Sequence, residues 1–284
     1  MLTQFTIAQW NVQTKSWDAR LTVNFAVIFT FRLTEVDGPK QNRQVWEDPK
    51  NDAGSCKMNR TKNTIGWCDL SWNPITGCKH GCWYCYAKKL ATRGFIKNNF
   101  EPTFYPERLK EPWELKKPSK IFCCSVSDLF APWTPQLWRE QVFDSMLFCP
   151  VKHIFQTLTK NPENIPKNVI YPNNFWFGTT VTCDNDCRNI EEIKKVKASV
   201  RFASFEPLLG SLPHFVNLKG LDWIIIGKLT GSKKVTLKRE WVTDIIHECL
   251  DYDIPIFMKN NLCPIFEKNE LIQQFPKLEG VAEV

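Results

Sequence analysis

No apolar stretch in this sequence is long enough to cross a membrane, because a spanning helix needs about 20 such residues. The apolar run from Phe25 to Phe31 is too short, and Arg32 follows it. The first residues lack the charged start and the small-residue cleavage site of a secretory signal. We therefore expect a cytoplasmic protein without a membrane segment.

Long runs of like charge and low-complexity segments are missing as well. Hydrophobic residues make up 43% of the chain and charged residues 24%, which allows a sizeable core and excludes global disorder. The 37 basic and 30 acidic residues give a net charge of +7. This modest excess suits a phosphate-bearing ligand or a nucleic acid, but many soluble enzymes share it.

Cysteine is abundant by contrast, with 12 among 284 residues. In a reducing compartment, clustered cysteines bind metal or carry out redox chemistry more often than they pair. Cys78, Cys82 and Cys85 are spaced Cys-x3-Cys-x2-Cys, just after an expected strand and at the start of an expected helix. Thiolates are the usual ligands of iron–sulfur clusters. Three thiolates on a four-iron cube leave one iron open, as a catalytic metal site requires.

The organised part of the sequence begins near Met58. Residues 1–57 form a poorly organised N-terminal extension with a polar, turn-rich stretch from Asp37 to Ser55. We favour a gene start assigned too far upstream over a true appendage. Residues 58–284 then form one catalytic domain.

Short apolar runs alternate with amphipathic segments after residue 58, which predicts an α/β fold with right-handed βαβ units. The runs are nearly continuous, as is typical of parallel strands buried on both faces. The expected strands are 70–74, 120–126, 153–158, 175–181, 200–205, 222–227 and 254–258. The expected helices are 83–93, 135–147 with Thr134 as N-cap, 186–197 and 239–252.

Polar residues follow each expected strand at its C-terminal end. In a barrel of parallel strands these ends meet at one face, where ligands bind. Polar residues are also ordinary at the start of a loop, but six successive strands favour a binding face. This face would gather hydroxyls, carboxylates and the lysines Lys160 and Lys259.

The sequence around the cysteines resembles the cysteine motif of the radical S-adenosylmethionine superfamily, with the aromatic residue Tyr84 before the last cysteine. Further motifs resemble one uncharacterised phage- and prokaryote-associated family of unknown function, distantly similar to spore photoproduct lyase. These motifs are Trp72–Pro74, Pro106–Leu109, Ser127–Phe130, Leu158–Lys160, Phe205–Gly210 and Asp222–Gly227. The resemblance runs from about residue 65 to residue 261.

The resemblance implies a partial (β/α) TIM-like barrel of about six parallel strands, with the cluster loop after the first strand. It implies that Cys78, Cys82 and Cys85 ligate a [4Fe–4S] cluster whose open iron binds S-adenosylmethionine. One electron, from a donor such as flavodoxin or ferredoxin, would cleave a carbon–sulfur bond. The products would be methionine and a 5′-deoxyadenosyl radical, which takes a hydrogen atom from the substrate. Oxygen should bleach such a cluster.

Further roles follow for residues at the strand ends. Tyr84 and Tyr86 would pack against the cluster or the adenine. Relatives bind the methionine amino group where Ser125, Ser127 and Asp128 stand, but this sequence lacks their Gly-Gly-Glu. The ribose or carboxylate would contact Thr179 and Thr180. We take Glu206, Lys160 and Lys259 as candidate catalytic residues: Glu206 for ribose hydroxyls or substrate, and the lysines for a carboxylate or phosphate. An ion pair of Glu206 with Arg201 or a lysine is the alternative.

The substrate expected from this likeness and from the basic loop near Lys228 is a nucleic-acid base or nucleotide. Two other hypotheses stay open: a structural zinc or iron–sulfur module, with His80 as a possible fourth zinc ligand, and a nucleic-acid-binding protein without catalysis. Cys183 and Cys187, with Cys68 or Cys263, would be the ligands of a second cluster, although buried cysteines are commonly just small hydrophobes. The oligomeric state stays open.

Overall fold

The computed structural model describes residues 9–11, 16–18, 58–61, 65–213, 216–230 and 235–277. The chain divides into two compact units, Met1–Asn51 and Asp52–Val284. In the first unit, β1 (Gln9–Asn11) pairs with β2 (Ser16–Asp18) in an antiparallel hairpin. The rest of the 1–57 extension, including Cys56, lies outside the described residues, as does the 232–234 part of the basic loop. The upstream gene start stays a prediction.

The second unit contains a curled eight-stranded sheet in the order β12-β11-β10-β9-β8-β7-β4-β3. Seven strands are parallel, and β3 (Asn59–Arg60) pairs antiparallel with β4 at one edge. The seven are β4 (Leu70–Trp72), β7 (Lys120–Cys123), β8 (Ile154–Thr159), β9 (Phe175–Thr180), β10 (Val200–Phe205), β11 (Trp223–Ile226) and β12 (Ile256–Met258). This confirms the predicted α/β partial barrel, with seven parallel strands where about six were implied.

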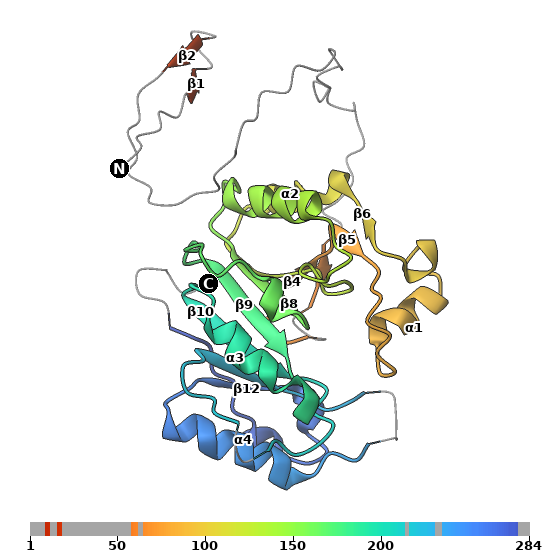
Figure 1. Ribbon diagram of the computed structural model, residues 1–284, viewed down its shortest axis with the longest axis vertical. Helices are drawn as coiled ribbons and strands as arrows, with labels where there is room; N and C mark the ends of the chain where they lie inside the picture. The colour runs from red at the N-terminus through yellow and green to blue at the C-terminus, as the bar shows by residue number, and fades with distance from the viewer. Residues whose placement is uncertain are drawn as a thin grey trace. The chain divides into compact units, whose positions relative to one another are not determined.

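Four helices connect these strands within the described residues: α1 (Tyr86–Thr92), α2 (Gln136–Leu147), α3 (Arg188–Lys194) and α4 (Arg239–Asp251). Figure 1 shows α2, α3 and α4 arranged around the sheet, while α1 stands near the short hairpin of β5 (Ile75–Thr76) and β6 (Thr103–Phe104). The expectation for Thr134 is wrong. Pro135 is the N-cap of α2, and the Thr134 hydroxyl donates to the backbone oxygen of Asp128 at 2.9 Å.

Alternate strand residues point to two different cores because side chains alternate across a strand. On β9, Phe175 and Phe177 pack in the larger core, which also holds α2 side chains, whereas Trp176 belongs to a second core. The second core is aromatic and includes Trp67, Phe122, Phe202 and Trp223. Gly178 lies here because a Cβ would stand 2.3 Å from the Phe202 ring. Packing on both faces accounts for the continuous apolar runs in the sequence.

Candidate functional site

A large cavity of about 670 Å³ lies at the C-terminal ends of the parallel strands. Its wall combines Trp67 and Phe122 of the aromatic core with polar residues that follow β7, β8, β10, β11 and β12. All of the site residues predicted from the sequence line this cavity except Thr179. Thr179 is buried, and its hydroxyl donates to the backbone oxygen of Thr159 at 3.0 Å. The barrel therefore gathers these residues at the face where ligands bind in such folds.

The cysteine loop, residues 77–85, lies between β5 and α1. Its backbone is held at the start, where Gly77 N–H donates to Val126 at 3.2 Å and Cys78 N–H donates to Phe100 at 3.0 Å. Gly77 has φ +88°, and a Cβ there would stand 2.2 Å from the Glu101 oxygen, so only glycine fits. At the other end, Cys85 is the N-cap of α1.

The three thiols of this loop form no disulfide. They are half-buried and line the cavity wall. Burial raises the pKa of Cys78 to about 12, and the charges of Asp128, Cys85 and Cys82 act in the same direction. The Cys78 thiol is therefore protonated at neutral pH, and a metal that binds it must displace the proton.

A single metal ion has no ready site in the part of the chain described: no three His, Cys, Asp or Glu side chains converge on one point. A structural zinc ion needs four such ligands, so the zinc hypothesis gains no support. A four-iron cube makes a different demand, because each thiolate binds its own iron. Three separate thiols on the wall of a roomy cavity fit that group.

Asp128 ties the cysteine loop to the ends of β7 and β8. Its side chain is 5% exposed, and both oxygens are fully used. Oδ1 accepts from Phe130 N–H at 3.0 Å and from the Thr159 hydroxyl at 2.6 Å. Oδ2 accepts from Lys160 N–H at 3.0 Å and lies 2.8 Å from His80 Nε2. A carboxylate with four partners has no acceptor site left for a methionine amino group, so Asp128 supports the loop instead.

Two serines after β7 also use their hydroxyls within the protein. Ser125 donates to Asn73 Oδ1 at 3.1 Å, and Ser127 donates to the Ile75 oxygen at 2.8 Å. The Tyr86 hydroxyl donates to the Ser125 oxygen at 2.5 Å. These bonds join the strand end to β5 and α1. Thr180, at the end of β9, lines the cavity without a side-chain bond to the described residues.

Tyr84 and Lys160 form a contact beside the cysteines. The Lys160 ammonium lies 5.5 Å from the centroid of the Tyr84 ring. Burial raises the pKa of Tyr84, which keeps its phenol neutral. Burial disfavours the charged form of Lys160, but Tyr84 and Asp186 together outweigh it and raise the Lys160 pKa. Lys160 is therefore cationic in the cavity wall.

Glu206 follows β10 and Lys259 follows β12, and the two form an ion pair with Lys259 Nζ 2.5 Å from Glu206 Oε1. This is the lysine pairing named as the alternative for Glu206, since Arg201 pairs with Asp222. Gly227 leaves room for the pair, because a Cβ there would stand 3.0 Å from the Glu206 Cδ. The Glu206 side chain is 25% exposed, so one carboxylate oxygen is still open to a ligand.

Three further residues in the wall were not named as site residues, although the sequence analysis placed one of them, Lys228, near the basic loop. Cys124 is buried at the end of β7 with φ +61°, and Cys123 Sγ lies 3.6 Å from Cys124 Sγ. Arg60 and Lys228 add cations to the wall. The Cys123-Cys124 doublet at a strand end could have identified Cys124 from the sequence, whereas no sequence feature identified Arg60.

The second group of cysteines has a different setting. Cys187 donates weakly to the backbone oxygen of Cys183, and neither lines the large cavity. Cys68 is buried against Thr61, and Cys263 is exposed. The second-cluster hypothesis gains no support from these contacts.

Several solved structures share this fold. Spore photoproduct lyase complexed with dinucleoside spore photoproduct matches with a TM-score of 0.50 and 10% identity, over 72% of this chain and 79% of that one. A variant of that lyase with dinucleoside spore photoproduct matches with a TM-score of 0.51 and 10% identity over the same shares. Another variant, with bound AdoMet and dinucleoside spore photoproduct, has a TM-score of 0.50 and 9% identity, again over those shares. At such identity the likeness establishes the fold alone.

No curated protein matches the chain. No helix in the described ranges is long and apolar enough to cross a membrane. The model of the family described as "Protein of unknown function (DUF5131)" matches residues 62–273, most of the chain. That span covers the seven parallel strands, the cysteine loop and the cavity wall apart from Asn59, Arg60 and Thr61. The chain belongs to the DUF5131 family.

Proposed function

We propose that this protein is a radical S-adenosylmethionine enzyme acting on a nucleic-acid base or nucleotide. The observation that carries the proposal is the position of the cysteine loop. Cys78, Cys82 and Cys85 line the same cavity as Tyr84, Glu206 and the lysines at the strand ends. When bound, a [4Fe–4S] cluster with S-adenosylmethionine supplies a 5′-deoxyadenosyl radical after one electron enters.

The protein's own residues divide the work in this proposal. The three thiolates hold the cluster, and Asp128 holds the loop that carries them. Tyr84 and Tyr86 offer aromatic surface to the adenine, and the free oxygen of Glu206 accepts from ribose hydroxyls. Lys160 and Lys259 attract carboxylate or phosphate groups. The aromatic layer beneath the cavity keeps water from the floor.

The charge of the cavity wall supports an anionic substrate. Arg60, Lys160, Lys228 and Lys259 line it, against the carboxylates of Asp128 and Glu206. Excess cations at a cleft raise the local concentration of phosphate-bearing molecules. The structurally similar lyase was solved with a bound dinucleoside, which supports the same class of substrate for this protein. The electron comes from outside the chain, from a donor such as flavodoxin or ferredoxin.

The test is anaerobic reconstitution with iron and sulfide, followed by reduction with dithionite. We expect about four irons per chain, a brown chromophore that oxygen bleaches, and 5′-deoxyadenosine with methionine in equal amounts. Adding DNA, tRNA, nucleotides or peptides in turn should raise the yield for a nucleic-acid substrate. Protein that holds one zinc, or that binds nucleic acid without forming 5′-deoxyadenosine, would overturn the proposal.

A further inference from the structure

A second, small cavity of about 420 Å³ adjoins the large one. Five residues line both cavities: Asn59, Ser71, Asn73, Leu90 and Val126. A ligand in the small cavity therefore reaches the wall of the large one. The volume falls within the roughly 300–1,000 Å³ of small-molecule sites.

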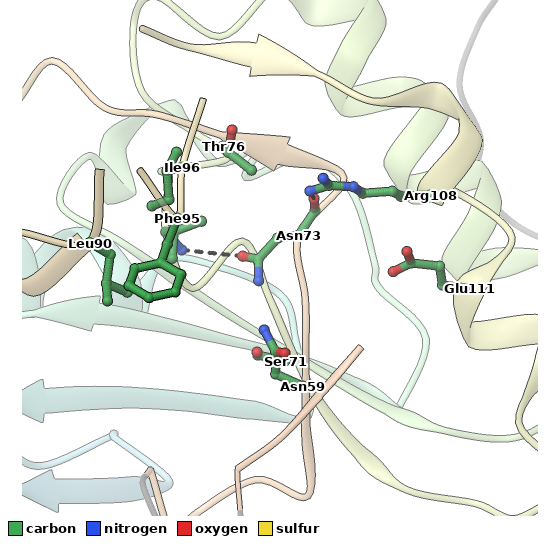
Figure 2. A pocket seen from close by; sticks show the side chains of 10 residues that line it. Asn59, Ser71, Asn73, Thr76, Leu90, Phe95, Ile96, Arg108 and Glu111 are labelled. Atoms are coloured by element: carbon green, nitrogen blue, oxygen red, sulfur yellow. Dashed lines mark hydrogen bonds between the residues drawn. The ribbon is translucent and has the colours of Figure 1, made fainter. Parts of the chain in front are cut away.

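The two sides of the small cavity differ in chemistry. Figure 2 shows Leu90, Phe95 and Ile96 on one side, with Asn73, Ser71 and Asn59 facing them. Arg108 and Glu111 lie farther along the wall. This pair carries opposite charges, so the cavity wall has no net charge. An apolar face opposite a hydrogen-bonding edge suits a flat, neutral, polar ring.

Phe95 is 75% exposed, yet its backbone is held in place by hydrogen bonds. Gly94 has φ +80° at the end of α1, Gly94 N–H donates to the Ala91 oxygen at 2.9 Å, and Phe95 N–H donates to the Leu90 oxygen at 3.0 Å. These two bonds form a Schellman motif, which holds the residue after the glycine against the helix. The exposed ring is a prepared surface for an apolar contact.

The same helix carries a cysteine of the loop at its other end. Cys85 is the N-cap of α1, and the helix has seven residues, a length of ~10 Å at the usual rise per residue. A ring stacked on Phe95 is thereby held at a set distance from the cysteine loop. No separate domain motion is needed to bring the two together.

The polar side of the small cavity, formed by Asn73, Ser71 and Asn59, has hydrogen-bond donors that a ligand can use. Asn73 Oδ1 accepts from the Ser125 hydroxyl at 3.1 Å and from Val126 N–H at 3.2 Å, which fixes the amide orientation. Its Nδ2 group has no partner among the residues that the structure describes, and neither has the Ser71 hydroxyl. Both line the cavity. They can bond the edge of a heterocycle, as proteins do when they read an unpaired base.

We propose that the small cavity binds one unpaired nucleobase, stacked on Phe95 with its edge toward Asn73 and Ser71. The inference rests on the proposed function and adds where the base lies. A base in a duplex cannot enter a cavity, so the substrate is single-stranded or has an extruded nucleotide. The attached phosphate reaches the cations of the large cavity, of which Arg60 is next in sequence to Asn59.

The experiment measures the binding of dinucleotides to the full chain by calorimetry, beside abasic dinucleotides with the same phosphate. Intact dinucleotides should bind, and abasic ones should bind at least tenfold more weakly. Phe95→Ala should weaken binding of the intact ligand by about 5- to 150-fold, the range for loss of one base stack. Phe95→Trp should retain binding. The matched control is Phe148→Ala, because Phe148 is 65% exposed and lines neither cavity.

Equal binding of the abasic ligand, or Phe95→Ala within twofold of the wild type, would overturn the inference. Substrate-free formation of 5′-deoxyadenosine is measured in the wild type and in the control Phe148→Ala, where it should be equal. If the wild type forms none, the proposed enzyme function fails, while the dinucleotide titration still decides whether the cavity binds a base.

Discussion

Two carboxylates line the large cavity, one after β7 and one after β10, and the protein holds them in different ways. Asp128, beside the cysteine loop, has four hydrogen-bond partners and is 5% exposed. Glu206, at the end of β10, bonds only Lys259 among the described residues and is 25% exposed. Both residues follow a strand in the sequence, and nothing in the sequence separates them.

This difference in hydrogen bonding gives the two carboxylates different roles. A saturated, buried carboxylate fixes the groups around it, because each bond to a charged group contributes about 1.5–3 kcal/mol. A carboxylate with a free oxygen accepts bonds from a ligand. We therefore expect the Asp128 side of the cavity to control whether the metal group is held. The Glu206 side should control how well the small-molecule cofactor binds.

The largest effect should come from the cysteine loop itself. Cys82→Ser replaces a thiolate ligand with a poorly metal-binding hydroxyl, so the brown chromophore and 5′-deoxyadenosine formation should both be lost. Absorbance and iron content after reconstitution measure this. Cys263→Ser, at an exposed cysteine outside the cavity, is the control and should keep both. A fully active Cys82→Ser protein would remove the basis for assigning a cluster to this side.

Asp128→Asn should have the next largest effect. The amide nitrogen cannot accept hydrogen bonds, so two of the four donors lose their partner. We expect a loss of about 1–3 kcal/mol in the free energy of unfolding, measured by urea denaturation, and reduced iron content after reconstitution. Only the loss of iron separates a role in positioning the loop from a purely structural one.

Asp222→Asn supplies the matched control. Asp222 accepts three bonds from Arg201 and does not line the cavity. Its replacement should lower stability by a similar amount and leave the iron content unchanged. If Asp128→Asn also kept its full complement of iron, the division between the two sides of the cavity would be wrong.

The fold was largely predictable because local pattern and global packing agree. The expected strand 200–205 matches β10 at both ends, and the expected strand 175–181 differs from β9 by one residue. The predicted helix starts were less accurate where a side chain caps the turn before the helix. The expected helix 186–197 begins only at Arg188, because the Asp186 carboxylate accepts from Thr182 and holds a tight turn before it.

The site was predictable as a set of residues but not as a network. Strand-end position identified Asp128, yet its four donors come from three separate parts of the chain, which no local pattern reveals. Thr179 and Thr180 are adjacent, and the strand pleat places only Thr180 on the cavity. Phe95 had no signal at all, since an exposed aromatic residue after a helix is ordinary in sequence.

Glu206→Gln should have a smaller effect, confined to the cofactor. The neutral amide keeps the shape but loses the charge that Lys259 pairs with and one acceptor oxygen. We expect the KM for S-adenosylmethionine to rise about tenfold, equivalent to one charge-assisted bond, with iron content unchanged. Steady-state 5′-deoxyadenosine formation measures the first and iron analysis the second. Loss of iron in this variant would mean that both sides of the cavity hold the cluster.

The smallest effect should come from Gly227→Ala, which changes the same side without replacing a polar group. The new Cβ would stand 3.0 Å from Glu206 Cδ and 3.1 Å from Oε1, too close by a few tenths of an ångström. The side chain can shift, but its bond to Lys259 must shift with it. A displacement of this size should raise the KM for S-adenosylmethionine about two- to fivefold, since a misplacement of 1 Å can cost about a hundredfold in rate.

If Glu206 acts through its carboxylate position, Gly227→Ala in the Glu206→Gln background should raise the KM less than it does alone. Full additivity would instead mean that Gly227 matters for the backbone, and that Glu206 is only the partner of Lys259.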